Sequence, residues 1–283
     1  MEIIVGKYSG FCNGVRYTVE KANEAVDSNQ SIYCLGELVH NERVIEDLEK
    51  KGMKTISSIE DAEDNSKVII RAHGEIKSTY DRAEEKGIEL LDLTCGKIKA
   101  IRTKIKNKMD DYFIIIIGKK NHPETLGVQS FSGDDSYILE NEEDINEFLD
   151  IYKKSNKNKL YIVSQTTFNS DKFDLLIDAI NKVFTDEIIV DKTICDATSN
   201  RQEETRELSK NVDVMIIVGG KKSSNTKELE VISKENCNRV YLVQETSDLQ
   251  DVKIEDTCKV GIMAGASTPE IVVKEIIDYL EGR

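Results

Sequence analysis

The sequence contains no tryptophan and only two prolines, Pro123 and Pro269, among its 283 residues. It also lacks a long hydrophobic run. No wholly apolar stretch with strand character is longer than Phe113 to Ile117, whereas a membrane-spanning helix needs about 20 apolar residues. The first residues, MEIIVGK, lack the charged and then apolar segments of a signal peptide. These absences predict a cytoplasmic protein that does not enter a membrane, and its six cysteines are expected to stay reduced.

The sequence also has no excess of basic over acidic residues. The chain has 39 Lys and Arg residues against 53 Asp and Glu residues, a net charge of −14, which argues against a general nucleic-acid binder. An anionic small molecule remains compatible with this charge if His, Ser, Asn and helix N-termini form a local pocket of donors. A hydrophobic content of 39% and a charged content of 33% are typical of a globular chain. The length favours two or three subdomains, and we expect a monomer.

The cysteines form no C-x-x-C pair, and their surroundings divide them into two groups. Cys34, Cys237 and Cys258 lie in or beside apolar, strand-like runs, where we expect them to be buried structural residues. The other three each follow an apolar run and precede a polar helical stretch. They are Cys12 in EIIVGKYSGFCNGVRYTV, Cys95 in IELLDLTCGKIKAIRTKI and Cys195 in EIIVDKTICDATSNRQEE.

These three cysteines mark an internal repeat. Each is followed 23 or 24 residues later by a glycine that ends another apolar run: Gly36, Gly118 and Gly219. A polar residue stands four positions past each glycine, namely His40, His122 and Ser223. A third apolar run in each repeat is followed by a further polar residue, which is His73, Thr166 or Ser267. Thr166 and Ser267 each lie 48 positions after the glycine of their own repeat.

Alternation of short apolar runs with helical stretches predicts an α/β fold with parallel sheets. We predict three similar units over residues 13–95, 96–195 and 196–283, the last one completed by an N-terminal strand within residues 1–12. Loops beyond the carboxyl ends of parallel strands carry ligand sites. Three units arranged about a pseudo-threefold axis would therefore direct three thiols, and all three histidines of the chain, at one centre.

Three thiolates without an obvious fourth protein ligand favour an iron-sulfur cluster over structural zinc, which prefers four ligands. An iron that the protein leaves open can act as a Lewis acid. Anion-binding positions are also present. Ser223, Ser224 and Asn225 begin a predicted helix, and Ser267 precedes Pro269 at the start of another. Glu124 follows His122 by two residues, and the negative charge of a bound anion would raise its pKa toward that of a neutral-pH proton donor.

The motifs GFCNGV, GKKNHPE, SQTT, ATSNRQE, GGKKSSN and AGASTP together resemble the 4-hydroxy-3-methylbut-2-enyl diphosphate reductase family of the methylerythritol phosphate route to isoprenoids. The resemblance covers essentially the whole chain. It implies a trefoil of three α/β units around a [4Fe-4S] cluster with one open iron. The implied cluster ligands are Cys12, Cys95 and Cys195. The implied diphosphate-binding residues are His40, His73, His122, Ser223, Ser224, Asn225 and Ser267.

The resemblance further implies that Glu124 carries protons and that Thr166 lies beside the substrate hydroxyl. Two electrons, supplied by a ferredoxin or a flavodoxin, would pass through the cluster. The C–O bond would break, water would leave, and protonation would give isopentenyl or dimethylallyl diphosphate. One departure is that Gly96 follows the second cysteine, where many relatives have proline.

Two other functions fit part of the pattern. A three-unit iron-sulfur dehydratase of the quinolinate synthase type would also leave one iron open, but it needs no diphosphate site beside His122, Pro123 and Glu124. A cluster-based sensor would perform no chemistry, and it would not need the ring of polar residues around the thiols.

Overall fold

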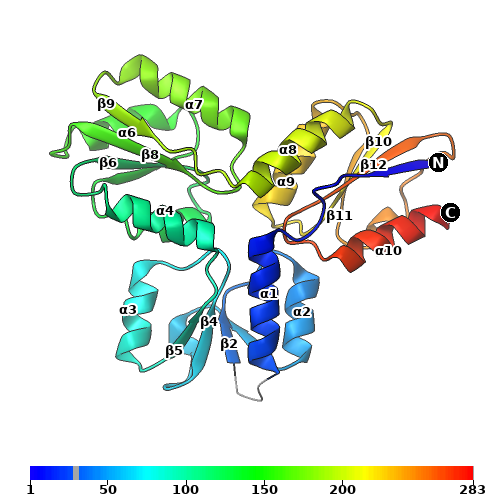
Figure 1. Ribbon diagram of the computed structural model, residues 1–283, viewed down its shortest axis with the longest axis horizontal. Helices are drawn as coiled ribbons and strands as arrows, with labels where there is room; N and C mark the ends of the chain where they lie inside the picture. The colour runs from blue at the N-terminus through cyan, green and yellow to red at the C-terminus, as the bar shows by residue number, and fades with distance from the viewer. Residues whose placement is uncertain (28–31, 283) are drawn as a thin grey trace. The chain divides into compact units, whose positions relative to one another are not determined.

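The computed structural model describes residues 1–27 and 32–282, and these form three four-stranded parallel sheets connected by helices (Figure 1). Within these residues, no helix combines the length and the apolar character that crossing a membrane would require. The α/β class with parallel sheets, predicted from the alternation of apolar runs and helical stretches, is confirmed.

The first sheet in chain order has the strand order β3-β2-β4-β5. Its strands are β2 (Ile32–Leu35), β3 (Met53–Ile56), β4 (Lys67–Ile70) and β5 (Glu89–Asp92). The intervening helices are α2 (Glu42–Lys50), the 3-10 helix η1 (Ile59–Asp61) and α3 (Lys77–Glu85). The central strands β2 and β4 are buried except at Lys67, as expected for parallel strands covered on both faces.

The second sheet has the order β7-β6-β8-β9. Its strands are β6 (Phe113–Ile117), β7 (Ser136–Leu139), β8 (Lys159–Ser164) and β9 (Glu187–Val190). Helices α4 (Gly96–Lys106), α5 (Pro123–Gln129), α6 (Asp144–Tyr152) and α7 (Ser170–Val183) belong to this part of the chain. Alternate residues of β6 and β8 face opposite sides. One side packs on α6 and α7, and the other side packs on α4 and α5.

The third sheet joins the two ends of the chain in the order β1-β12-β10-β11. Its strands are β1 (Glu2–Val5), β10 (Val214–Val218), β11 (Val240–Val243) and β12 (Lys259–Ala264). Strand β1 pairs with β12 in parallel, with Glu2 opposite Lys259. The remaining helical elements are α1 (Asn13–Val26), α8 (Asp196–Ser209), α9 (Ser224–Lys234), η2 (Thr246–Leu249) and α10 (Glu270–Glu281).

The three sheets repeat one plan, which confirms the predicted repeat. In each sheet, one edge strand is followed in the sequence by a repeat cysteine, and the strand beside it in space is followed by a polar loop. The next strand across the sheet ends at the repeat glycine. The N–H of this glycine donates to the carbonyl of the last residue of the other edge strand. These hydrogen bonds join Gly36 to Ile56, Gly118 to Leu139 and Gly219 to Val243, with N···O distances of 2.8, 3.0 and 2.8 Å.

Close packing explains why glycine recurs at this position. A Cβ atom on Gly118 would lie 2.6 Å from the Thr125 methyl carbon and 2.8 Å from Gln165 Cβ. A Cβ atom on Gly219 would lie 2.7 Å from the Thr268 hydroxyl and 2.8 Å from that of Thr226. The backbone after the strand can therefore approach its neighbours only without a side chain.

The described residues divide into two compact units. One comprises residues 1–20, 39–50 and 196–283, and contains the third sheet. The other comprises residues 21–38 and 51–195, and contains the first and second sheets. The finer division at residues 13–95, 96–195 and 196–283 stays a prediction.

Cys34, Cys237 and Cys258 are buried, as predicted from their apolar surroundings. Cys34 is fully buried in β2, and its thiol donates to the carbonyl of Gly36 at 3.3 Å.

We expect Cys34→Ala to lower the free energy of unfolding by about 1–2 kcal/mol, because it leaves a small cavity. A urea titration would measure this, and the absorption of the predicted cluster should persist. Loss of that absorption would show that the two groups of cysteines had been assigned wrongly.

Candidate active site

Each of the three repeat cysteines stands immediately before a helix. Cys12 precedes α1, Cys95 is the N-cap residue of α4, and Cys195 precedes α8. All three side chains are partly exposed, unlike those of the other cysteines. The Cys12 sulfur also accepts the backbone N–H of Val15 at 3.5 Å. A helix N-terminus carries a partial positive charge, so these positions suit anionic thiolates.

A common backbone hydrogen bond ties each cysteine to the polar loop of its own sheet. The N–H groups of Cys12, Cys95 and Cys195 donate to the carbonyls of Ala266, Ala72 and Thr166 at 3.1, 2.9 and 3.0 Å. These hydrogen bonds make Thr166 equivalent to Ala72 and Ala266. His73 and Ser267, which lie one residue further on, are therefore equivalent to Thr167 and not to Thr166. The equal spacing of 48 residues to Thr166 and Ser267 therefore does not mark equivalent positions.

The polar residues past the repeat glycines begin helices or lie close to their starts. His122 is the N-cap of α5, and its Nδ1 accepts the N–H of Glu124 at 3.1 Å. Ser223 is the N-cap of α9, and its hydroxyl accepts the N–H of Thr226 at 3.3 Å. His40 precedes α2, and its carbonyl accepts the Ser267 hydroxyl at 3.1 Å. A side chain at Gly220 would collide with that carbonyl.

The first turn of α9 offers polar groups that are buried but incompletely used. Ser223, Ser224 and Asn225 are 5%, 6% and 3% exposed. Among the described residues, neither the amide nitrogen nor the carbonyl oxygen of the Asn225 side chain has a hydrogen-bond partner. A buried amide without a partner is costly. Together with the helix N-terminus, this favours a bound anion that accepts these hydrogen bonds.

Glu124 is only 1% exposed and lies in the first turn of α5. Burial raises its pKa to about 7, although hydrogen bonds from Thr166 and the charge of Arg102 act in the opposite direction. The Thr166 N–H donates to Glu124 Oε1 at 2.6 Å, and the Thr166 hydroxyl donates to Oε2 at 2.8 Å. Burial is thus enough to raise the pKa of Glu124, and the further rise expected from the charge of a bound anion stays a prediction.

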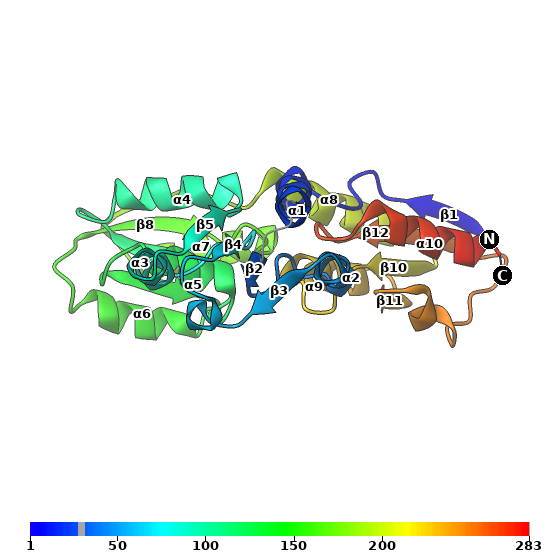
Figure 2. The same cartoon turned by 90° about the horizontal axis from the view of Figure 1, so that it is seen from below.

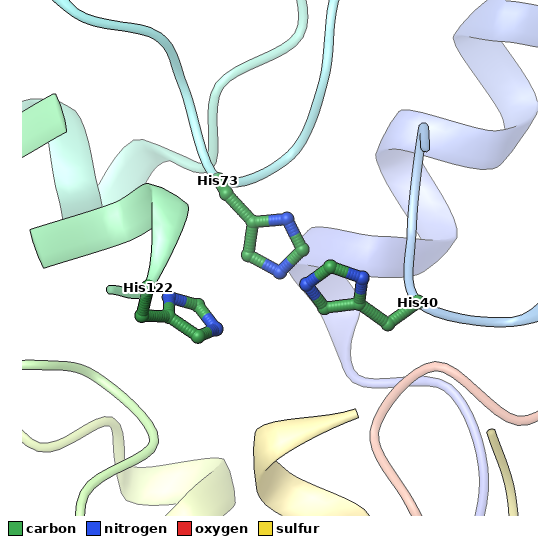
Figure 3. Close-up of side chains that lie close together, drawn as sticks. All are labelled: His40, His73 and His122. Atoms are coloured by element: carbon green, nitrogen blue, oxygen red, sulfur yellow. The ribbon is translucent and has the colours of Figure 1, made fainter. Parts of the chain in front are cut away.

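Figure 3 shows the three histidine side chains. His73 and His122 belong to the same compact unit, and their ring centroids are 5.4 Å apart with planes inclined by 84°. His122 is the more buried of the two. Since His122 also caps the helix that carries Glu124, these residues form a compact polar cluster within that unit.

A family model described as "LytB protein" matches residues 3–281. The chain belongs to the LytB family. The 4-hydroxy-3-methylbut-2-enyl diphosphate reductase of Thermoanaerobacter sp. (strain X514) is 36% identical over 98% of this chain and 96% of its own length.

Two solved structures are also similar to this LytB family member. One is the E-1-hydroxy-2-methyl-but-2-enyl-4-diphosphate reductase of Plasmodium falciparum, with a TM-score of 0.90 and 30% identity. It matches 99% of this chain and 87% of that one. The other is described as (E)-4-hydroxy-3-methyl-but-2-enyl diphosphate reductase, the terminal enzyme of the non-mevalonate pathway. It has a TM-score of 0.71 and 34% identity, and the match covers 100% of this chain and 99% of that one.

The structure adds two residues of this LytB chain that fix the Cys12 loop and that sequence reasoning missed. The Arg201 guanidinium on α8 is 4% exposed and donates to the carbonyls of Gly10 and Ala197 at 2.5 and 2.7 Å. One turn later, the Glu204 carboxylate accepts the N–H groups of Lys7 and Tyr8 at 2.6 and 2.8 Å. The motif ATSNRQEE contains both residues, but nothing in it indicates a partner about 190 residues away.

Arg102 on α4 was also missed. It donates to the Glu75 carbonyl at 2.9 Å and to the Tyr80 hydroxyl at 3.1 Å, and it lies 4.5 Å from the Phe131 ring centroid. Arg102 therefore joins α4 to the loop after His73, to α3 and to the segment that follows α5. The departure at Gly96 has no visible consequence, because Gly96 starts α4 and a Cβ atom there would meet open space.

Proposed function

We propose that this chain reduces (E)-4-hydroxy-3-methylbut-2-enyl diphosphate to isopentenyl and dimethylallyl diphosphate. The observation that carries the proposal is the match over almost the whole chain to LytB relatives that bear this reductase name. The reaction consumes two electrons and two protons. The allylic C–O bond breaks, the hydroxyl leaves as water, and a C–H bond forms on the hydrocarbon.

We propose that Cys12, Cys95 and Cys195 hold a [4Fe-4S] cluster that leaves one iron without a protein ligand. The donor chemistry of these residues fits such a group, because all three thiols are partly exposed at helix starts and thiolates are the usual ligands of iron-sulfur clusters. The buried thiols of Cys34 and Cys237 instead donate to backbone carbonyls. When bound, the cluster would supply electrons and a Lewis-acidic iron.

The first turn of α9 is the proposed binding site for the diphosphate. We propose that Ser223, Ser224 and Asn225 bind it, since their buried polar groups meet the positive end of a helix dipole. Further proposed donors to the diphosphate are His40, His73, His122 and Ser267. The orphaned amide of Asn225, described above, supports this assignment.

Glu124 is the proposed proton donor, with His122 and Thr166 as its catalytic neighbours. A carboxyl whose pKa is about 7 holds its proton at neutral pH and can still release it. The Thr166 hydroxyl donates to Glu124, so the lone pairs of the hydroxyl oxygen remain available to the substrate hydroxyl. Thr166 would thereby connect the acid to the group that leaves.

The finer features of the enzyme are also proposals. We propose that a ferredoxin or a flavodoxin supplies the electrons, that the enzyme is monomeric, and that it works in the cytoplasm.

Anaerobic turnover of the hydroxylated C5 diphosphate with a reduced viologen dye tests the function. We expect consumption of the dye to match formation of isopentenyl and dimethylallyl diphosphate, at two electrons per product. A protein with its cluster intact that binds the diphosphate but never oxidises the dye would contradict the proposal. A brown colour with absorption at about 400 nm would indicate thiolate-bound iron and would exclude zinc as the metal at the three cysteines.

Asn225→Asp tests the diphosphate site. The two side chains have the same size, but the carboxylate would repel the diphosphate at the start of α9. We expect the KM to rise by roughly 10²-fold, consistent with about 3 kcal/mol for an unfavourable buried charge, while the cluster absorption persists. Initial rates at varied substrate concentration provide the measurement, and Asn236→Asp, on a different part of the same unit, is the control. An unchanged KM would remove Asn225 from the binding site.

A further inference from the structure

Helix α4 is strongly basic within an acidic protein. Its 11 residues include five basic side chains and no acidic one, although the whole chain has a net charge of −14. The basic residues are Lys97, Lys99, Arg102, Lys104 and Lys106. The four lysines are exposed, whereas Arg102 is only partly exposed.

The other two helices that follow repeat cysteines do not share this charge. Helix α1 contains two basic and two acidic residues, and α8 contains two basic and four acidic residues. The repeat architecture places all three helices at equivalent positions, directly after a cysteine. The positive charge of α4 is therefore not a requirement of the fold or of the position next to a thiol.

Packing leaves the lysines of α4 on the surface. Ile98, Ile101 and Ile105 are 3%, 3% and 0% exposed and belong to the hydrophobic cluster that includes residues of β6 and β8. Figure 2 shows α4 lying along one side of β8. The lysines occupy the remaining sides of the helix, and they begin two residues after Cys95.

Two lysines of α4 form ion pairs with nearby acids. Lys99 pairs with Asp92 at 3.0 Å, and Lys104 pairs with Asp191 at 2.8 Å. These pairs are partly exposed to solvent, and pairs of this kind contribute roughly 0–1 kcal/mol. Their lysines can exchange one carboxylate for another at little cost.

We propose that α4 is the docking surface for a small acidic electron-carrier protein. The inference rests on the proposed function, which requires two electrons from outside the chain, delivered in two one-electron transfers as two carriers are oxidised. Charge complementarity selects the partner, since the acidic remainder of the protein repels such a carrier while the lysines attract it. The N-terminus of α4 is also where Cys95, a proposed cluster ligand, lies. A docked carrier would thus face the region that must receive its electrons.

Electron-transfer complexes are typically small and weak, so the effect should appear in the association rate. The test variant is Lys97→Glu/Lys106→Glu, which changes the first and last turns of α4. Its matched control is Lys172→Glu/Lys182→Glu, which changes the first and last turns of α7 on the opposite face of the same sheet. Both pairs of lysines are exposed, and both variants alter the net charge equally.

The measurement compares turnover with a reduced acidic ferredoxin and with a reduced viologen dye, which needs no docking surface. With ferredoxin at low salt, we expect kcat/KM of the α4 variant to fall by about tenfold or more, since steering of this kind changes rates by roughly 10–10³. Its salt dependence should also weaken, while turnover with the dye matches that of the control.

Equal ferredoxin turnover in the α4 variant and the α7 control would overturn the docking proposal. Absence of dye turnover in the unmodified enzyme would instead contradict the proposed function, so the two failures are distinguishable. If the α4 variant loses dye turnover through misfolding, Lys97→Gln/Lys106→Gln replaces it. That variant supports docking only if ferredoxin turnover falls while dye turnover persists, and it overturns docking if both persist.

Discussion

Cys95→Ser is expected to produce a protein with little or no stable cluster. A serine hydroxyl is neutral at pH 7 and replaces a soft thiolate with a hard oxygen, which iron-sulfur clusters bind poorly. Only two of the proposed ligands would remain. Iron and sulfide content, determined after anaerobic purification, should fall to a small fraction of the unmodified value, and reductase turnover should fall with them.

The fold itself should survive this change. A backbone hydrogen bond from Cys95 to Ala72 ties this loop to its sheet, and it does not depend on the side chain. Cys237→Ser is the matched control, since its thiol already donates to the carbonyl of Arg239 and a hydroxyl can do the same. Full iron content in an anaerobically prepared Cys95→Ser protein would remove Cys95 from the ligand set.

Glu124→Gln is expected to keep the cluster and bind substrate but to turn over roughly 10²-fold or more slowly, as is typical when a general acid is lost. The amide matches the carboxyl in shape. Its oxygen can accept the Thr166 N–H, and its NH2 group can donate to the Thr166 hydroxyl in place of the present hydrogen bond, but the amide cannot deliver a proton. Single-turnover kinetics with the pre-reduced enzyme would separate this step from binding. Glu142→Gln, at an exposed position of the same unit, provides the control. Near-normal turnover would assign the proton to another group.

The pH dependence supplies an independent test of Glu124. Burial raises its pKa from 4.5 to about 7 in the folded protein, so turnover should decline as the pH rises above about 7, where the acid is lost. The same shift stabilises the protein below pH 4.5, and this contribution is lost as the pH rises through about 7. Both pH dependences should flatten in Glu124→Gln, as measured by rate profiles and by urea midpoints between pH 5 and 8. A turnover decline unchanged by the mutation would belong to a different group.

Local patterns were enough to predict much of this molecule. The apolar runs that end at Gly36, Gly118 and Gly219 are strands. Such runs are typical of parallel strands, because helices cover both faces of the sheet and every side chain of a central strand is buried. Capping chemistry located the helix start at Ser223, whereas the helix that begins after His122 was found only in the structure. The spacing of the cysteines indicated three similar units, and the three sheets follow one plan.

Spacing along the chain was less reliable for matching individual loop residues. The count of 48 residues aligned Thr166 with Ser267, whereas the hydrogen bonds of Cys195 and Cys12 align Thr166 with Ala266. Loops tolerate single-residue differences in length because they are not held in a regular ladder. Hydrogen-bond partners, rather than residue counts, therefore define equivalence there.

By itself, the sequence indicated the strands of the parallel sheets, the repeat, and the cysteines and polar residues that are proposed to bear the chemistry, because capping and hydrophobic periodicity act over a few residues. Only the tertiary structure decided that Thr166 reaches Glu124 across 42 positions, that burial sets the pKa of this acid, and that Arg201 and Glu204 hold the Cys12 loop. These properties depend on which distant segments exclude water from a side chain. No local stretch of sequence carries that information.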